Sequence, residues 1–336
     1  MEVHIQTFGT SVRLINGLLS IKHDNTFNQV PIGKIDRLIL KKGIHISTDV
    51  IYECLDQGVD ILLMDRSGMP VGRLWNNRFG SISTIRKGQL DYAQHQNVMP
   101  WVGKNLKEKF SNQSDLLLCL LSLSDPQEML IKQCVARIDS LSDRINDVVT
   151  LSQDEAGGKL RAIEGQVSKI YFDCINKHLP NRFQFSRRSK RPALDMINSM
   201  LNYAYGSLYS HIESALIKSG LDPFIGFFHR DEYNRPVLTY DVIEPFRPWA
   251  DWVVFHLCIN EVYDETFFEV SEGGYWMMGE GKRILIQHFA DFFEEVIDYK
   301  KARFSRYSHI DRHCQNLADM ILTKQKQTNS DDVTDF

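Results

Sequence analysis

Residues 12–21 have the sequence VRLINGLLSI, in which two short apolar runs flank Asn16-Gly17. An Asn-Gly pair supplies the positive φ angles that a two-residue β-turn requires, because asparagine tolerates this conformation and glycine has no side chain to oppose it. The stretch therefore predicts a β-hairpin with strands at 12–15 and 18–21. The N-terminal part of the chain should be built on β-strands.

Further strand signals continue to about residue 86. The candidates are residues 35–40, 44–46, 60–64 and 71–75. Turn-forming Asp, Ser, Gly and Pro separate the last two. Between the second and third, Ser47 or Thr48 could cap a short helix that runs through Leu55 and ends at Gly58. No catalytic cluster stands out here, so we interpret residues 1–86 as a β-rich, β-sandwich-like domain for scaffolding or dimerisation.

From about residue 87 onward the apolar periodicity is helical. Residues 125–128, DPQE, resemble a helix start, and the apolar stripe from Leu130 to Val148 predicts a helix of about six turns. The polar tail, residues 324–336, lacks periodicity and is predicted to be disordered. The predicted fold class is α+β, with the β-rich domain followed by a larger all-α domain at 87–323.

Composition places the chain among globular proteins. Its 336 residues allow one large or two ordinary domains, and 43% are apolar and 24% charged. No apolar run approaches the ~18 residues of a membrane span, and the N-terminus lacks the layout of a signal peptide. Six scattered cysteines without a CxxC pair favour a reducing cytoplasm over a disulfide framework or a cysteine-based zinc site. The net charge of −4 means that any nucleic-acid surface must be local.

Residues 220–248, GLDPFIGFFHRDEYNRPVLTYDVIEPFRP, contain a cluster of groups that could carry chemistry. His229, Asp241 and Glu244 fall within sixteen residues, each at the edge of an apolar run. Residues 237–240 are predicted to be extended and a helix to begin at Asp241, so that both carboxylates could point the same way. An Asp followed three residues later by a Glu is also typical of a helix-capping box, and a lone His after two phenylalanines is often a core residue. The stretch alone leaves a metal site and a structural role open.

A third carboxylate comes from a helix predicted at 154–179. Its apolar stripe consists of Leu160, Ile163, Val167, Ile170, Tyr171 and Cys174. At about 100° per residue, Glu164 falls on the margin of this stripe. A carboxylate there is unfavourable unless it is paired, hydrogen-bonded or bound to a metal. The alternative is that Glu164 reaches solvent or pairs with a lysine or arginine.

Two basic stretches bear on a partner. The first contains Arg182, Arg187, Arg188, Lys190 and Arg191, with Phe183 and Phe185 among them. Such cations neutralise phosphates and aromatic rings stack on unpaired bases, so this stretch predicts DNA or RNA binding. The second contains Lys300, Lys301, Arg303, Arg306 and Arg312, with Tyr299 and Tyr307. For the second stretch, binding and an ordinary solvated face stay equally open.

Two further patterns could be mistaken for catalytic features. Tyr240 lies next to Asp241, but the chain shows no arginine and histidine constellation of a tyrosine recombinase around it. His309 and His313 are spaced i and i+4, like a metal-binding pair. Without other clustered ligands, we expect this pair to be solvated or to face DNA.

Four linked blocks carry a family resemblance. They are Glu164-Gly165 with Tyr171-Phe172, RRSKRPALDMINSMLNYAYG at 187–206, GLDPFIGFFH at 220–229 and LTYDVIEPFRP at 238–248. In this order and spacing the chain resembles the CRISPR-associated protein one family, the integrase subunit of CRISPR spacer acquisition. The resemblance covers nearly the whole chain, including the β-type N-terminal region.

The resemblance implies a homodimer joined through the β domains, a complex with CRISPR-associated protein two, and a catalytic, DNA-binding α domain. It implies that Glu164, His229 and Glu244 bind Mg²⁺ or Mn²⁺ and that Asp241 is a supporting catalytic carboxylate. The implied reaction joins the 3′-hydroxyl ends of short foreign DNA fragments to a CRISPR repeat by transesterification, and hydrolysis by a nuclease is the same chemistry with water. Arg247 could hold a DNA phosphate or pair with one of the acids. A casposon-type transposon integrase and a non-catalytic DNA-binding subunit are the alternatives.

Overall fold

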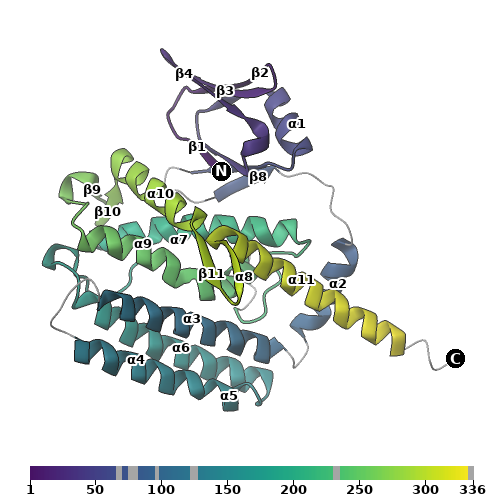
Figure 1. Ribbon diagram of the computed structural model, residues 1–336, viewed down its shortest axis with the longest axis vertical. Coiled ribbons are helices and arrows are strands. Elements are labelled where there is room, and N and C mark those ends of the chain that lie inside the picture. Colours follow the sequence, from purple (N-terminus) through teal and green to yellow (C-terminus); the bar gives the residue numbers. More distant parts are fainter. Residues whose placement is uncertain (66–69, 75–81, 95–97, 122–127, 230–234, 332–336) are drawn as a thin grey trace. The chain divides into compact units, whose positions relative to one another are not determined.

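The computed structural model describes residues 1–65, 70–74, 82–94, 98–121, 128–229 and 235–331, without the side chains of 70 and 325–331. The chain divides into two compact units, Met1–Gly80 and Ser81–Phe336. The first is rich in strands and the second is mostly helical (Figure 1). The predicted α+β fold class is thus confirmed. None of the described helices is both long and apolar enough to cross a membrane.

The N-terminal unit contains two four-stranded sheets. In the first, the order is β1-β5-β7-β8, with β8 antiparallel to β7 and the other pairs parallel. In the second, the order is β4-β3-β2-β6, with β6 parallel to β2 and the other pairs antiparallel. The strands are β1 (Glu2–Ile5), β2 (Ser11–Ile15), β3 (Leu18–His23), β4 (Thr26–Pro31), β5 (Arg37–Lys41), β6 (His45–Ile46), β7 (Asp60–Met64) and β8 (Pro70–Leu74). Apolar side chains from both sheets and from helix α1 (Thr48–Asp56) fill one core.

The predicted hairpin is present. Ile15 pairs with Leu18 across Asn16, at φ 51°, and Gly17, at φ 75°. Both angles lie in the left-handed region that a tight turn between twisted strands requires. Val12, which faces the core from β2, is fully buried. The turn chemistry and the apolar pattern thus act together to set this register.

Other N-terminal predictions were also close to the structure. The four further strand candidates correspond to β5, β6, β7 and β8. Helix α1 begins after Ser47, whose side chain makes no capping hydrogen bond, and Gly58 follows its end at φ 74°. Strands β1 and β4 were not predicted. In β4 only one of six residues is even partly buried, so the strand has no apolar alternation to reveal it.

The second unit consists mainly of helices. These are α2 (Ile82–Ala93), α3 (Val98–Leu120), α4 (Glu128–Asp143), α5 (Ile145–Val148), α6 (Gln153–Asn176), α7 (Met196–Lys218), α8 (Val237–Val242), α9 (Arg247–Ile259), α10 (Gly279–Glu294) and α11 (Arg306–Asp331), with 3₁₀ turns η2 (Asn181–Phe183), η3 (Glu244–Phe246) and η4 (Glu265–Phe267). Two small hairpins, β9–β10 (Phe268–Ser271 and Gly274–Met277) and β11–β12 (Val296–Tyr299 and Ala302–Ser305), were not predicted.

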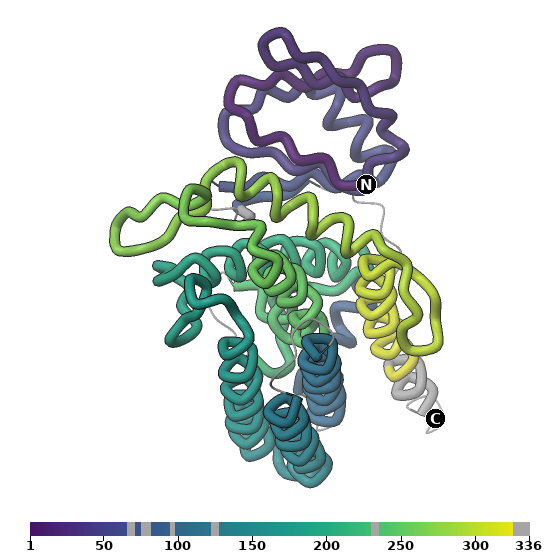
Figure 2. The backbone as a smooth tube through the Cα atoms, turned by 60° about the vertical axis from the view of Figure 1, so that its left-hand side comes forward, coloured from purple at the N-terminus to yellow at the C-terminus, as the bar shows by residue number. Residues whose placement is uncertain are grey.

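Helix α3 is central to the arrangement of the second unit. It packs against α4 and α6, and the three helices lie side by side in both views (Figures 1 and 2). It also contacts η3 and α9. Helix α7 in turn packs on α9 and α11. Segments that are far apart in the sequence are therefore brought to one side of α3, where polar side chains meet within a largely apolar core.

The helix predicted through Val148 is interrupted. Helix α4 ends at Asp143, and Ile145–Val148 form the separate short helix α5. The break lets α5 approach α3 closely: a Cβ added to Gly103 would lie 2.9 Å from Ile145 Cγ2. Tertiary packing thus interrupts a helix that the apolar stripe alone predicts to be continuous. The predicted helix start at 125–127 lies outside the described residues.

The predicted ends of the helical domain also differ from the structure. The boundary placed at residue 86 falls inside α2, where Ile85 and Gln89 are already buried at helical spacing. Disorder was predicted from residue 324, but α11 continues to Asp331. Residues 306–331 contain no glycine or proline, and the good helix formers Lys and Gln occupy 324–327. The last residues, 332–336, lie outside the described part of the chain.

The Asn16-Gly17 turn gives a stability prediction with a matched control. Gly17→Ala meets no atom within 4 Å, so its cost is backbone strain alone, about 1–2 kcal/mol lower free energy of unfolding. Gly158→Ala in α6 also meets nothing within 4 Å, has ordinary helical geometry, and should raise the free energy of unfolding by up to about 1 kcal/mol. Urea unfolding of both variants measures the two effects, and shifts of the same sign would contradict the argument.

Candidate active site

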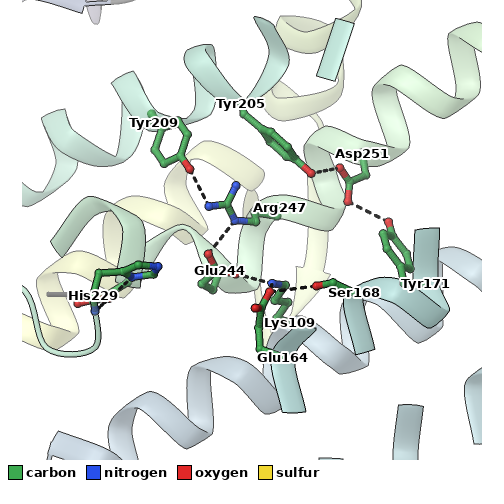
Figure 3. A network of polar contacts seen from close by, with 11 residues as sticks. Lys109, Glu164, Ser168, Tyr171, Tyr205, Tyr209, His229, Glu244, Arg247 and Asp251 are labelled. Atoms are coloured by element: carbon green, nitrogen blue, oxygen red, sulfur yellow. Dashed lines mark hydrogen bonds and ion pairs between the residues drawn. The ribbon is translucent and has the colours of Figure 1, made fainter. Parts of the chain in front are cut away.

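Two of the predicted carboxylates meet at a lysine that was not predicted. Glu164 lies on α6, Glu244 opens η3, and Lys109 lies on α3 (Figure 3). The Lys109 Nζ atom is 2.5 Å from Glu164 Oε1 and 2.6 Å from Glu244 Oε2. The sequence offered pairing of Glu164 with a cation as one alternative, and the structure shows that pairing. Lys109 could have been noticed in the same way as Glu164, because it stands next to Phe110 and three residues after Leu106 on the buried face of α3.

Burial makes this pairing necessary. The side chains of Lys109 and Glu244 are only 4% and 8% exposed, and that of Glu164 is 32% exposed. Burial favours the neutral forms, lowering the pKa of Lys109 and raising that of Glu244. The neighbouring opposite charges outweigh this effect of burial on both pKa values. They raise the pKa of Lys109 above its usual value, and Arg247 with Lys109 holds the pKa of Glu244 at about 2. Glu244 is therefore a carboxylate at neutral pH.

Arg247 is the second cation on Glu244. Its Nε atom donates to Glu244 Oε1 at 2.8 Å, and Nη2 donates to the Tyr209 hydroxyl at 2.6 Å. The guanidinium also lies over the rings of Tyr205 and Tyr209, at 5.0 and 5.3 Å. The sequence left open whether Arg247 holds a phosphate or an acid. In this structure it pairs with Glu244, and its contact with DNA stays a prediction.

Asp241 holds the segment that carries His229. Its Oδ2 atom accepts the backbone N–H groups of Phe227 and Phe228, at 2.6 and 3.0 Å. Its Oδ1 atom accepts the backbone N–H of His229 at 3.0 Å and lies 2.6 Å from His229 Nδ1. A hydrogen bond from Nδ1–H leaves His229 Nε2 with a lone pair for a metal or a proton. Asp241 therefore positions His229, and its supporting role in catalysis stays a prediction.

The local structure around Asp241 differs from the sequence prediction. Residues 237–240 were expected to be extended, but they belong to helix α8, and Asp241 lies near the end of that helix. Asp241 is therefore not the cap of a helix that continues through Glu244. Val237, Leu238 and Val242 of α8 are buried. Packing against the core thus outweighs the strand preference of the β-branched valines.

Asp241, which contacts His229, and Glu244 border the same small cavity. Phe228 and residues of α3 line the rest of this cavity. Figure 3 shows His229 beside Glu244. Within the part of the chain that the structure describes, no three His, Cys, Asp or Glu side chains converge closely enough to enclose a metal ion.

Comparison with known proteins assigns the chain to a family. The family model for CRISPR associated protein Cas1 matches residues 3–291. The chain belongs to the Cas1 family. It is 30% identical to CRISPR-associated endonuclease Cas1 1 of Archaeoglobus fulgidus, across 97% of this chain and 98% of that protein. The resemblance seen in the sequence is thereby confirmed.

Two solved structures show the same fold. A Cas1 protein from Thermotoga maritima superposes with a TM-score of 0.77 at 19% identity, covering 96% of this chain and 97% of that one. A casposase bound to an integration product superposes with a TM-score of 0.78, also at 19% identity, covering 96% of this chain and 91% of that one. The fold alone does not separate a Cas1 protein from a casposase.

In the first basic stretch of this Cas1 chain, some cationic side chains contact other residues of the protein and the others are exposed. Arg188 donates to the side chains of Asn198 and Asn202 and lies over the Tyr205 ring. Arg182 pairs with Glu261 at 3.0 Å. The remaining three cations of the stretch have exposed side chains: Arg187, Lys190 and Arg191. Partial desolvation of this otherwise exposed side chain, together with nearby Arg247 and Arg188, lowers the pKa of Lys190, and Glu244 is near enough to oppose that shift.

The aromatic residues of that stretch do not face solvent. Phe183 and Phe185 are buried in the hydrophobic core, so they offer no ring for base stacking, contrary to the sequence interpretation. Their spacing of two residues gave no indication of which way they point. In the second basic stretch, Arg306 pairs with Glu295 at 2.6 Å and Lys300 pairs with Glu108. Part of that stretch thus serves to stabilise the fold.

Neither histidine of the pair on α11 is exposed, since His309 is buried and His313 is partly buried. His309 Nε2 lies 3.3 Å from the Ile297 carbonyl oxygen, and the ring packs against Tyr299. His313 packs edge-on against Phe246, and burial lowers its pKa to about 4. The prediction of a solvated or DNA-facing pair was wrong. Helical spacing shows that two residues share a face, but not whether that face is covered.

A second buried carboxylate, Asp251, is linked to the site through Tyr205. Asp251 of α9 accepts hydrogen bonds from Tyr171 of α6, at 2.9 Å, and from Tyr205 of α7, at 2.5 Å (Figure 3). Tyr205 is the ring over which Arg247 lies. Burial raises the pKa of Asp251 to about 6, although the tyrosine hydroxyls and nearby arginines act to lower it. Asp251 thus links three helices to the arginine that holds Glu244.

The raised pKa of Asp251 predicts a pH dependence of stability. Well below pH 4 this residue is neutral in both states. As the pH rises to about 6, the unfolded chain ionises first, and the free energy of unfolding falls by an amount on the order of 3 kcal/mol. Asp251→Asn should remove this loss. Urea unfolding of both proteins between pH 4 and 7 tests it, and parallel pH profiles would show that Asp251 does not titrate there.

Proposed function

We propose that this chain is a divalent-metal-dependent DNA endonuclease and integrase that joins the 3′-hydroxyl ends of short DNA fragments to a CRISPR repeat by transesterification. The observation that carries the proposal is the convergence of Glu164 and Glu244 on one cation position, beside an imidazole held by Asp241. Membership of a family whose Archaeoglobus fulgidus relative is named an endonuclease supports the same chemistry.

The donor set fits a divalent cation. Glu164 and Glu244 come from different elements and already share one positive charge, and His229 has its Nδ1 atom engaged by Asp241. These three side chains would hold Mg²⁺ or Mn²⁺, because carboxylates suit both ions and imidazole suits the latter. The ion, when bound, would supply Lewis-acid polarisation of the phosphodiester and charge stabilisation of the leaving oxygen.

The chain's own residues supply positioning and charge. Asp241 fixes the orientation of His229, and the low pKa of Glu244 keeps that ligand ionised at neutral pH. The exposed cations Arg187, Lys190 and Arg191 would hold the DNA backbone. Phosphoryl transfer depends mainly on such positioning and charge neutralisation, so the proposal needs no covalent nucleophile on the enzyme.

The proposed partners are those that the family resemblance implies. They are DNA, both the fragment to be inserted and the repeat, and the small CRISPR-associated protein two. A homodimer would form through the N-terminal β-rich unit. A casposase shares the fold, so dependence on a CRISPR repeat is the property that would separate the proposed function from transposon integration.

Strand transfer tests the proposal directly. Glu164→Gln, Glu244→Gln and His229→Ala should each reduce joining of a labelled 3′-hydroxyl DNA fragment to a repeat-bearing plasmid by about a hundredfold or more, because each removes a metal ligand. EDTA should abolish the reaction and Mn²⁺ or Mg²⁺ restore it. Glu280→Gln, which alters an exposed glutamate paired with Arg283, is the control and should keep full activity.

Three outcomes of this assay would change the assignment. DNA binding without joining or cleavage under any metal, with the partner protein included, would favour the structural-subunit alternative. Joining that is as efficient in plasmids without a repeat would favour a casposon-type integrase. Undiminished activity in all three ligand variants would place the reaction elsewhere in the chain.

The salt dependence of DNA binding tests the basic surface. Replacing Arg187, Lys190 and Arg191 together by alanine should reduce the slope of log K against log salt by roughly 2–3, since each phosphate contact contributes about 0.7–0.9. Arg283→Ala removes an exposed arginine of another helix, one that pairs with Glu280, and should leave the slope unchanged. Fluorescence anisotropy between 50 and 300 mM salt, about a sixfold range, measures both. Equal slopes in all proteins would exclude this surface.

A further inference from the structure

Lys109 occupies the point where the two proposed metal-binding carboxylates meet. The contacts that the structure describes for its ammonium group are with Glu164 and Glu244, at 2.5 and 2.6 Å. Arg247, by contrast, is anchored by the Tyr209 hydroxyl and by two tyrosine rings in addition to Glu244. Of the two cations on Glu244, Lys109 is therefore the one that depends on the carboxylates for its position.

The position of α3 does not rest on this lysine alone. One turn further along, Asn112 Nδ2 donates to the Pro245 carbonyl oxygen at 2.7 Å, which ties α3 to η3 beside Glu244. Leu106 and Phe110 of the same helix are buried in the core. Ser168 donates to Glu164 Oε1 at 3.0 Å and helps to orient that carboxylate from its own helix. The scaffold that brings the carboxylates together thus has supports besides the Lys109 ammonium.

The two glutamates and the two cations that contact them are balanced in charge. Glu164 and Glu244 contribute two negative charges, and Lys109 and Arg247 contribute two positive ones. A divalent cation bonds to carboxylate oxygens at about 2.0–2.6 Å, depending on the ion. The Nζ atom of Lys109 already lies at a comparable distance from one oxygen of each carboxylate. An ammonium group and a metal ion cannot share that point, because both steric overlap and charge repulsion oppose it.

We propose that Lys109 is a displaceable internal counter-ion: its ammonium group fills the cation position between Glu164 and Glu244 until a divalent metal ion binds there and drives it out. This inference rests on the proposed metal site and adds a residue that sets its affinity. The four-carbon side chain can swing without movement of the helix. Lys109 holds the buried Glu244 carboxylate and the partly exposed Glu164 carboxylate close together without metal, and metal binding has to overcome the ion pairs that it makes.

Nuclear magnetic resonance of the wild-type protein tests the displacement itself. With ¹³C-labelled lysine, the Cε–Hε signal of Lys109 is assigned as the one missing from Lys109→Met. Titration with Mg²⁺ should move this signal as the ion binds, with binding measured in parallel by calorimetry. Saturation of the Glu164–Glu244 site with the Lys109 signal unmoved would overturn the proposal. No Mg²⁺ binding, together with no metal-dependent joining, would instead remove the proposed metal site on which it rests.

Metal affinity gives a second test that does not depend on activity. Lys109→Met should bind Mn²⁺ about tenfold more tightly than the wild type or better, because the competing cation is gone. Lys107→Met removes a lysine two residues away that contacts Asn146 instead, and it should bind Mn²⁺ as the wild type does. Electron paramagnetic resonance of free Mn²⁺ measures all three proteins. Adding Glu244→Gln to Lys109→Met should abolish the gain and so locate the ion.

Folding of the variants has a separate check. If Lys109→Met is destabilised enough to unfold, Lys109→Gln keeps a hydrogen-bond donor without the charge and should show the same tighter binding. Circular dichroism confirms that each variant is folded before titration. A folded variant of either kind that binds Mn²⁺ no more tightly than the wild type would show that Lys109 is only a structural ion pair.

Discussion

The site in this Cas1 chain depends on one electrostatic constraint. Two carboxylates from separate elements, the partly exposed Glu164 and the buried Glu244, are held close together, which is unfavourable unless positive charge lies between or beside them. Lys109 supplies that charge from α3 and Arg247 supplies it from the start of α9. The packing of α3 against α6, η3 and α9 is what allows both cations to reach.

The constraint extends outward through hydrogen bonds. Arg247 is held by Tyr209 and lies over Tyr205, and Tyr205 donates to the buried Asp251, which also accepts from Tyr171. This chain of contacts joins α6, α7 and α9, so the geometry at Glu244 is coupled to the packing of the helical core. A buried polar network of this kind is favourable only when its members are satisfied, and it then fixes one arrangement of the helices. The Asp241–His229 contact is a second, local device, since both residues lie within one short segment.

The sequence was most informative where the physical cause is local. Asn16-Gly17 predicted the turn of the first hairpin, and the apolar stripe around Leu160 predicted α6. The order and spacing of four linked blocks, which contain Glu164, His229 and Glu244, indicated the family. It was least informative where distant segments decide the outcome. Residues 237–240 are helical despite their strand preference, and the helix predicted beyond Asp143 is interrupted. The side chains of Phe183, Phe185 and His309 are buried, which was not predicted.

The sequence by itself therefore determined the fold class and the family, and it named the three side chains of the proposed metal site. These follow from turn chemistry, periodicity and motif order, which act over a few residues or are preserved as a pattern along the chain. Only the tertiary structure decided which charges surround those side chains. Lys109 lies 55 residues from Glu164 and 135 from Glu244 along the chain, and its role arises from the crossing of three separate segments. Periodicity can place a charged residue on a buried face, but it does not name the partner of that charge, because the partner is fixed by packing and not by spacing.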